Sequence, residues 1–481
     1  MVGSRATSRA TSGVEVQLDL AGPRVRSGLE HELREAVRQG RLAPGTRLPS
    51  SRTLARDLGI GRNTVADAFG QLVAEGWFVA RHGAGTWVAD RSLDGPKAAP
   101  ASEGAEPAEV APRARFDLRP GLPDLAGFPR AEWLAAARRA LAVAPDESLG
   151  YGDPRGLAVL REALAGYLVR ARRVAASPGR IVVCAGFTQA LELIGAVLRD
   201  RGATRVAVEA YGHRLHRDIL ATCGLAPVPV PIDGRGAVVA ALAAGRDDVG
   251  GVLLTPAHQF PLGVALDPAR RRQVVGWAAD TGALVVEDDY DGEFRYDRQA
   301  VGAVQSLAPD QVIYAGTAAK SLAPGLRLAW LVLPAGLVDE VVDARQRRGM
   351  FPSALDQLTL AELVVSGGFD RHVRRARLSY RRRRDRLLSA LARHAPQVEV
   401  SGIAAGLHAL AHLPAAGPTE AEIVARAAEH GLALEGLGAF THPAPAPGDD
   451  RRGPALVVGY GTPPDHAYTA TLARLTAVLS P

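Results

Sequence analysis

The stretch "GALVVEDDYDGEFRY", residues 282–296, joins an apolar run to ten residues that hold five acids and two tyrosines. The apolar run has the length of a buried β-strand, and the charge begins where that strand would end. In an open α/β sheet, ligands bind outside the carboxyl ends of the strands. The acidic cluster is therefore a candidate wall of a binding site.

Strand and helix patterns alternate on both sides of this stretch. Short apolar runs such as "RIVVCAG" (180–186), "RVAVEA" (205–210) and "GVLLTP" (251–256) are separated by helical patterns such as "TQALELIGAVLRD" (188–200). This alternation is typical of a parallel sheet with helices on both faces. We expect an α/β domain with a mostly parallel sheet.

A lysine follows another predicted strand in "VIYAGTAAKSLAPGLRLAW", residues 312–330. A lysine and a carboxylate at neighbouring strand ends suit pyridoxal 5′-phosphate, since the lysine forms a Schiff base and the carboxylate keeps the pyridine nitrogen protonated. Lys320 is the candidate Schiff-base lysine and Asp288 the candidate carboxylate. Tyr290 is expected to donate to the phenolic oxygen of the ring.

The phosphate of such a cofactor needs its own binding site. At Gly186, Phe187 and Thr188 a predicted strand turns into a helix, whose first backbone amides favour a dianion. Thr317 and Arg327 are expected to complete this cup, the arginine by charge-assisted hydrogen bonds.

Two further polar residues, His258 and Gln259, follow the strand in "TPAHQFPLG", residues 255–263. We expect them to hydrogen-bond the ring or its phenolic oxygen. Each of these motifs alone has an ordinary structural explanation, such as a surface lysine or a helix cap. Together, five strand-end motifs occur in an order that lets one ligand touch them all.

A different pattern occupies the N-terminal part, in "LPSSRTLARDLGIGRNTVADAFGQLVAEGWF", residues 48–78. Ser50 or Ser51 caps a short helix through Leu58, "GIG" forms a turn, and Asn63 starts a second helix. Two helices joined by so short a turn form a helix-turn-helix. The continuation "FVARHGAGTWVA" (78–89) predicts a hairpin wing.

The charge of this module favours nucleic acid. Residues 41–81 hold six arginines against three acids. The start of the second helix would reach base edges in a major groove, and the other basic and hydroxyl groups would meet phosphates. A solvated face or a protein-interaction module is the alternative. The residues assigned to DNA contact are Arg47, Ser51, Arg52, Arg62, Asn63, Thr64, Arg81, His82 and Gly83.

The chain is long enough for two or three domains. We expect a disordered tail (1–19), a winged helix-turn-helix domain (20–90), a Pro/Ala-rich linker (91–115) and a large cofactor-binding domain (116–481). The formal charge of +6 permits a polyanionic partner.

The two cysteines offer no disulfide framework or cysteine metal cluster, and no apolar run approaches the ~18 residues that span a bilayer. We expect a cytoplasmic protein that has no membrane segment and binds no metal.

The motifs quoted above resemble known families. Residues 41–88 look like the winged helix of GntR-type bacterial transcription regulators. Residues 116–478 resemble the fold type I aminotransferases, which also share the segments "DLRPGLPDLAGFPRAEW", "LGYGDPRGLAVLREALAGYL" and "AGLHALAHLP". Over residues 20–478 the chain is similar to the MocR/GabR family of regulators. The resemblance implies pyridoxal phosphate, a homodimer, and Tyr151 reaching the phosphate across the dimer interface.

The chain departs from the resembling families at two positions. "EAYGHRLHR" (209–217) places His213 where a tyrosine commonly stacks near the ring. "ALVVGYG" (455–461) places Val457 where aminotransferases generally have a carboxylate-binding arginine. Arg214, Arg451 and Arg452 are the candidates to substitute for it.

The arginine-rich segment "RHVRRARLSYRRRRDR", residues 371–386, has two interpretations. It is either a second nucleic-acid patch or an amphipathic helix with an exposed basic face, and its apolar spacing favours the helix.

Two functions follow from these motifs. The first is a regulator that binds promoter DNA and senses pyridoxal phosphate or an amine adduct of it, with residual imine exchange or half-transamination at most. The alternative is a working aminotransferase with an appended winged helix, since a fold does not settle a function. Val457 favours the regulator.

Overall fold

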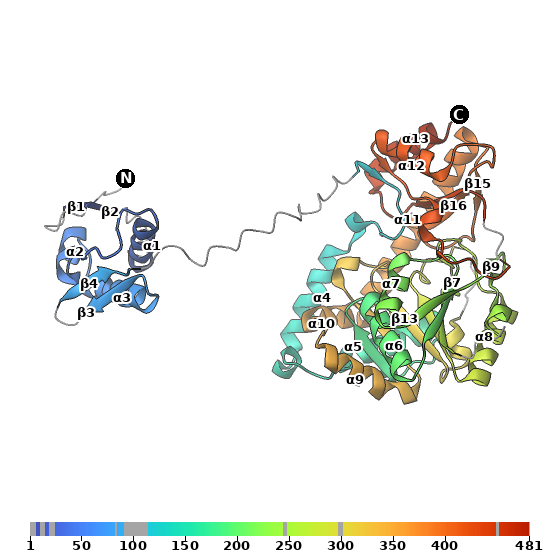
Figure 1. The fold of residues 1–481 in the computed structure, drawn as a ribbon, viewed down its shortest axis with the longest axis horizontal. Coiled ribbons are helices and arrows are strands. Elements are labelled where there is room, and N and C mark those ends of the chain that lie inside the picture. The colour runs from blue at the N-terminus through green and yellow to red at the C-terminus, as the bar shows by residue number, and fades with distance from the viewer. Residues whose placement is uncertain are drawn as a thin grey trace. The chain divides into compact units, whose positions relative to one another are not determined.

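The computed structural model of the chain describes residues 6–9, 15–18, 25–81, 84–90, 114–243, 248–296, 302–448 and 452–480. The chain divides between Ala111 and Pro112 into two compact units (Figure 1). His82, Gly83 and Arg451, which the sequence analysis singled out, lie outside the described residues, as does most of the expected linker.

Part of the expected N-terminal tail, residues 1–19, lies within the described residues. There the structure describes two antiparallel strands, β1 (Ala6–Arg9) and β2 (Glu15–Leu18). The sequence "EVQL" of the second strand alternates polar and apolar residues, which is a strand pattern that the Arg/Ser/Thr-rich composition concealed.

The small unit is a winged helix. Its elements are α1 (Val25–Arg38), α2 (Ser51–Leu58), α3 (Arg62–Ala74), β3 (Phe78–Arg81) and β4 (Gly85–Val88). The hydroxyl of Ser50 caps α2 by accepting from the amide of Thr53 at 3.1 Å. Gly59 ends α2 with φ +67°, a left-handed conformation that glycine adopts at low cost.

The small unit has a hydrophobic core of its own, formed by residues between Leu29 and Val88. Leu29 and Leu33 of α1 pack with Val65 and Leu72 of α3, and all four are almost fully buried. Leu29 and Leu33 are four positions apart and Val65 and Leu72 are seven apart, spacings that place each pair on one face of its helix.

The large unit is built on a seven-stranded sheet, in agreement with the predicted α/β class. Its strands, in spatial order, are β6 (Ile181–Cys184), β14 (Ala329–Val332), β13 (Val312–Thr317), β12 (Leu284–Asp289), β11 (Val249–Leu254), β7 (Arg205–Glu209) and β8 (Ala226–Val230). All neighbouring pairs are parallel except those of β14, which runs antiparallel to both neighbours.

Helices cover both faces of this sheet. Val182 and Cys184 of β6 face the core that α6 (Phe187–Asp200) and α9 (Val338–Arg348) complete. Ile181 and Val183 face the opposite core. The remaining helices of this region are α4 (Arg130–Val143), α5 (Ala158–Arg172), α7 (Arg214–Thr222), α8 (Pro268–Thr281) and α10 (Ala354–Val365).

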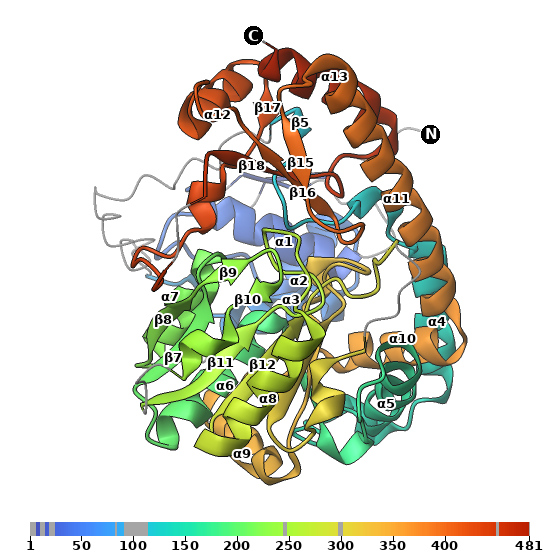
Figure 2. The same ribbon diagram turned by 90° about the vertical axis from the view of Figure 1, so that its right-hand side faces the viewer.

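A smaller lobe completes the large unit. Its sheet has the order β15 (Glu399–Ser401), β16 (His408–His412), β18 (Ala455–Gly459), and α12 (Glu420–Glu429) and α13 (Asp465–Leu479) pack beside it. Figure 2 shows the long helix α11 (Gly368–His394) running from the region of α4 and α10 to this lobe. The short strand pairs are β5 (Phe116–Asp117) with β17 (Leu432–Ala433) and β9 (Ile232–Asp233) with β10 (Gly236–Ala237).

The arginine-rich segment forms the helix that its apolar spacing predicts, but its basic residues are not all exposed. Arg383 is 1% exposed and binds the carboxylates of Asp124 at 2.6 Å and Asp465 at 2.7 Å. This arginine ties α11 to two other segments, because a buried guanidinium needs paired acceptors. Among the described helices, none has the length and apolarity needed to cross a membrane.

Candidate functional site

A cavity of about 230 Å³ lies at the carboxyl ends of the strands β6, β7, β11, β12 and β13. It brings together nine residues that the sequence analysis proposed for the cofactor. They are Gly186, Phe187, Thr188, His213, Asp288, Tyr290, Thr317, Lys320 and Arg327.

One end of the cavity is a cup suited to an anion. Helix α6 begins at Phe187, and Gly186 before it has φ +84°. A Cβ atom on Gly186 would lie 2.9 Å from Cζ of Arg327, so only glycine leaves room for this guanidinium. Arg327 donates to Oγ1 of Thr188 at 2.7 Å. A helix N-terminus, an arginine and a hydroxyl form the donor set that phosphate prefers.

The centre of the cavity holds a lysine and a carboxyl group on neighbouring strands. Asp288 pairs with Ala315 in the β12–β13 register, and Lys320 lies in the turn after β13. Burial lowers the pKa of Lys320, with Asp288 and Asp291 opposing this effect, and Nζ donates to the carbonyl oxygen of Gly121. A larger share of the amine is therefore unprotonated and nucleophilic.

Burial, followed by the charge of Asp289, raises the pKa of Asp288 well above its usual range. A cation placed against Asp288 would favour its carboxylate form.

One wall of the cavity is aromatic. The ring of His213 stacks on Phe260 with centroids 4.1 Å apart, and His216 lies against Phe187 at 4.9 Å. Burial, followed by the charge of Lys320, lowers the pKa of His213 to about 4; burial and His213 lower that of His216 to about 3. Both rings are therefore neutral near pH 7.

Phe260 and His216 also form this wall, and neither was predicted from the sequence. The spacing of the two histidines by three residues at the start of α7 was the available signal.

Three of the proposed residues do not line this cavity. Tyr151 is fully exposed. Gln259 is buried and its amide donates to the carbonyl oxygen of Tyr211 at 2.9 Å, so it supports the wall from behind. His258 is buried beside it and contacts Asp291 and Tyr290.

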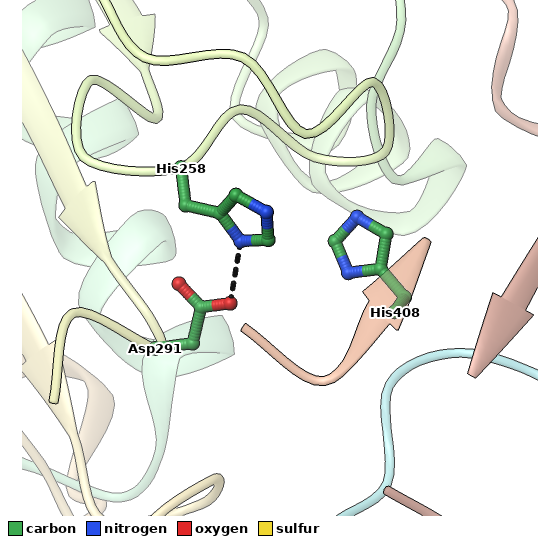
Figure 3. Close-up of side chains that lie close together, drawn as sticks. All are labelled: His258, Asp291 and His408. Atoms are coloured by element: carbon green, nitrogen blue, oxygen red, sulfur yellow. Dashed lines mark hydrogen bonds and ion pairs between the residues drawn. The ribbon is translucent and has the colours of Figure 1, made fainter. Parts of the chain in front are cut away.

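Figure 3 shows how His258 meets its neighbours. Nδ1 of His258 is 2.8 Å from Oδ2 of Asp291. The ring centroids of His258 and His408, which lies on β16, are 4.9 Å apart. Potential ligand atoms of these three residues lie within 4.8 Å of one another, a grouping that the sequence did not indicate.

The residues considered for carboxylate binding lie elsewhere. Val457 is buried within β18 and does not line the cavity. Arg214 is exposed and pairs with Asp218 at 3.3 Å, and Arg452 donates to the carbonyl oxygen of Ile232 at 3.2 Å. Arg217, which does line the cavity, donates to backbone carbonyl groups.

The small unit presents several of the described residues proposed for DNA on its surface. Arg62 and Asn63 are exposed at the first turn of α3, and Arg52 is exposed on α2, while Thr64 and Ser51 are partly buried. Arg47 and Arg81 lie over the ring of Trp87 on the wing, 5.5 and 5.0 Å from its centroid. Trp87 thus holds two cations side by side, a role that the sequence analysis missed.

Comparison with known proteins gives matches for both units. Residues 26–88 match the family described as bacterial regulatory proteins, gntR family, and residues 121–444 match aminotransferase class I and II.

The chain is 34% identical to the HTH-type pyridoxine biosynthesis transcriptional regulator PdxR of Corynebacterium glutamicum, over 79% of this chain and 82% of that protein. It is 32% identical to the probable rhizopine catabolism regulatory protein MocR of Rhizobium meliloti, over 83% and 84%, and to the HTH-type transcriptional regulator TauR of Rhodobacter capsulatus, over 90% and 93%.

The fold is also similar to solved aminotransferases. An archaeal alanine:glyoxylate aminotransferase has a TM-score of 0.66 and 26% identity, covering 76% of this chain and 90% of that one. The α-aminoadipate aminotransferase LysN of Thermus thermophilus, solved with N-(5′-phosphopyridoxyl)-L-leucine, has the same score and identity over 76% and 92%.

Proposed function

Because the chain belongs to the MocR-type family of HTH-type transcriptional regulators, we propose that it binds promoter DNA through its winged helix and senses pyridoxal 5′-phosphate, or an amine adduct of it, through its aminotransferase-like domain. One observation carries this proposal. A gntR-type domain and an aminotransferase-type domain occupy one chain, and this chain aligns with relatives named as regulators over most of their length.

The cavity fits pyridoxal phosphate in charge and shape. The cup at Gly186, Thr188 and Arg327 would hold the phosphate, and glycine there is what allows Arg327 to approach the start of α6. Asp288 would face the ring nitrogen, and Lys320 would hold the cofactor through its amine. When bound, the cofactor would supply an aldehyde that condenses with amines and an electron-poor ring that withdraws electrons from the condensed amine.

We propose that His213 takes the place of the stacking tyrosine. Its ring already stacks on Phe260, and it is neutral near pH 7 because burial lowers its pKa. A neutral aromatic face suits packing against the cofactor ring.

The regulatory output rests on the winged helix. Arg62, Asn63 and Thr64 at the start of α3 would read base edges, while Arg47 and Arg81 beside Trp87 would meet phosphates on the wing. Such a protein acts in the cytoplasm, where it reaches DNA.

An aminotransferase is the second candidate, and the lysine and carboxylate of the cavity support it. Rapid transamination also requires the substrate's Cα proton to be held over the lysine, an alignment that a clamped carboxylate normally provides. Val457 is buried in β18, and Arg217 already binds backbone carbonyls. We therefore propose imine exchange or slow half-transamination rather than a metabolic activity.

We also propose a homodimer formed by the large unit. Tyr151 is fully exposed, and Leu149, Val143 and Leu134 on neighbouring elements are more than half exposed. A second copy covering this face would bring Tyr151 toward the partner's cavity, as the resemblance to aminotransferases implies.

The test selects DNA fragments with the purified full chain, with and without pyridoxal phosphate, and measures the affinity for the selected site beside turnover on a panel of amino acids and 2-oxo acids. We expect specific binding whose affinity changes with the cofactor, and by linkage a cofactor affinity that changes with DNA. Turnover near ~10 s⁻¹ together with DNA affinity indifferent to cofactor and amines would establish the enzyme instead.

A further inference from the structure

A buried pair of polar side chains lies behind the cavity wall, and Tyr290, a hydrogen-bond partner of the pair, lines the cavity. His258 follows β11 and Asp291 follows β12, and each is 3% exposed or less. Nδ1 of His258 is 2.8 Å from Oδ2 of Asp291 and 3.1 Å from the hydroxyl oxygen of Tyr290. Tyr290 lines the cavity, whereas neither member of the pair does.

The acceptor chemistry of Asp291 fixes the proton on His258. A carboxylate only accepts hydrogen bonds, so Nδ1 carries the proton that it donates to Asp291. The hydroxyl oxygen of Tyr290 lies 3.1 Å from the same nitrogen. In the arrangement proposed below it accepts from this N–H, so that the phenolic proton is directed to an acceptor in the cavity rather than to Asp291. Burial, followed by the charges of Asp291 and Asp288, raises the pKa of Tyr290 well above its usual range. The phenol therefore keeps this proton near pH 7.

We propose that His258 is a positioning residue that holds the hydroxyl of Tyr290 as a proton donor toward the cavity, and that Asp291 fixes the tautomer of His258. The acceptor would be an anionic oxygen of the bound ligand, and its identity as the phenolic oxygen of pyridoxal phosphate rests on the proposed function. The arrangement follows the logic by which a carboxylate orients a histidine, which in turn orients a hydroxyl.

The backbone of Gly406 holds the pair from the other side. Gly406 has φ +71°, and a Cβ atom there would lie 2.4 Å from Nδ1 of His258 and 2.5 Å from Oδ2 of Asp291. Its carbonyl oxygen accepts a hydrogen bond from the hydroxyl of Tyr460 at 2.7 Å. This bond holds the backbone at Gly406 in place. His258 is thus confined between this glycine and Tyr290.

The same contacts argue against a metal ion held by His258, Asp291 and His408. Two ligands of a tetrahedral zinc ion lie about 3.3 Å apart, given bond lengths near 2.0–2.1 Å. The observed separation of 2.8 Å between His258 and Asp291 is that of a hydrogen bond. His408 also has a protein partner, since its Nε2 lies 3.1 Å from the carbonyl oxygen of Pro261.

The first arm of the test needs no cofactor. The full chain is labelled with 3-fluorotyrosine, and the ¹⁹F resonance of Tyr290 is identified as the one that Tyr290→Phe removes. We expect His258→Asn to move this resonance by more than its linewidth. His412→Asn, a histidine on β16 whose partner is Ser401 at 2.7 Å, should leave it in place. Should His258→Asn not fold, Asp291→Asn keeps the shape of the side chain and carries the same expectation.

The second arm follows the visible absorbance of added pyridoxal phosphate against pH. Loss of a donor to the anionic oxygen destabilises its charged form, so the midpoint should move to higher pH in His258→Asn and not in His412→Asn. A wild-type chain that takes up no pyridoxal phosphate would overturn the proposed function, while the ¹⁹F arm still decides the role of His258. An unmoved Tyr290 resonance overturns the positioning role. So does a stoichiometric Zn²⁺ complex that His408→Asn abolishes, because the three residues would then be a metal site.

Discussion

Gly186 is the residue on which the proposed phosphate cup depends most directly. Gly186→Ala should weaken pyridoxal phosphate binding, because the new Cβ would lie 2.9 Å from Cζ of Arg327 at φ +84°. The clash would move the guanidinium away from the phosphate, and a hydrogen bond to a charged group contributes about 1.5–3 kcal/mol. This is equivalent to a loss of affinity of roughly 10- to 150-fold in a spectroscopic titration.

The matched control for this change is Gly276→Ala. Gly276 lies within α8, and a Cβ there would meet no atom within 4 Å. Alanine should stabilise that helix by roughly 0.5–1 kcal/mol and leave cofactor affinity unchanged. Equal affinities in the two variants would remove Gly186 from the phosphate site.

His216 gives a prediction about acid stability. Its pKa in the folded chain is about 3, against 6.5 for an ordinary histidine, because burial disfavours the charged ring. Between these two pKa values the unfolded state binds more protons than the folded state. The contribution of His216 to the free energy of unfolding is therefore complete above about pH 6.5 and is lost as the pH falls toward 3. Each unit of difference between the pKa values of the folded and unfolded states corresponds to at most about 1.4 kcal/mol in the free energy of unfolding.

We accordingly expect His216→Phe to lose less thermal stability between pH 7 and pH 5 than the wild-type chain, measured by melting of the large unit. Phenylalanine can keep the contact with Phe187. The same replacement at the exposed His394 serves as the control. A melting temperature that falls equally in all three proteins would mean that His216 does not titrate on unfolding.

Some residues of the cavity could be predicted from the sequence, and others could not. Lys320, Asp288 and Arg327 could be proposed because each lies at or after the carboxyl end of a predicted strand, and parallel strands bring these ends to one edge. Phe260 and His258 could not be told apart in this way. They are two residues apart after β11, and only the turn geometry decides that Phe260 enters the wall and His258 lies behind it.

At the scale of the element, the proposed function assigns base reading to α3 and phosphate contact to the wing. Arg62→Ala should cost ~1–3 kcal/mol on the selected site and little on random duplex, if its side chain reads a base edge. Arg81→Ala should weaken both duplexes alike and reduce the salt dependence, since the wing would contact phosphates. Fluorescence anisotropy at several salt concentrations measures both.

Arg38 offers the control for these two changes. It lies on α1 and pairs with Glu35 at 2.8 Å, outside the proposed DNA-binding residues. Arg38→Ala should therefore leave affinity and specificity near their wild-type values. Equal losses from Arg62→Ala on selected and random DNA would rule out its reading role.

The sequence predicted where helices occur better than it predicted which of their side chains are exposed. The cap at Ser50 and the turn at Gly59 set the bounds of α2, and both are local features. In α11, apolar spacing indicated the helix, but Arg383 was expected on an exposed face. Its burial depends on Asp124 and Asp465, which lie 259 and 82 residues away in the sequence. A local sequence pattern cannot predict ion-pair partners that are so distant in the sequence.

At the scale of the whole molecule, the two units should fold separately. The core of the small unit draws only on residues 29–88, and the described cores of the large unit draw on residue 118 and beyond. We expect a fragment of residues 20–90 to bind duplex DNA with no response to pyridoxal phosphate, and residues 112–481 to bind pyridoxal phosphate. Calorimetry and anisotropy on the two fragments and the full chain test this.

In the full chain alone, pyridoxal phosphate should alter DNA affinity, because the coupling requires both units on one polypeptide. A cofactor response in the isolated winged helix would place the sensor in the small unit and contradict the proposal.

These separate cores also bear on ancestry. A chain whose halves shared buried side chains could not be assembled from parts without redesigning both interiors at once. Here the described core of each unit is built from residues of that unit, so a gene fusion through the Pro/Ala-rich segment would have left both cores unchanged. Selection could then act on the coupling between the two units, since both folds existed before the fusion.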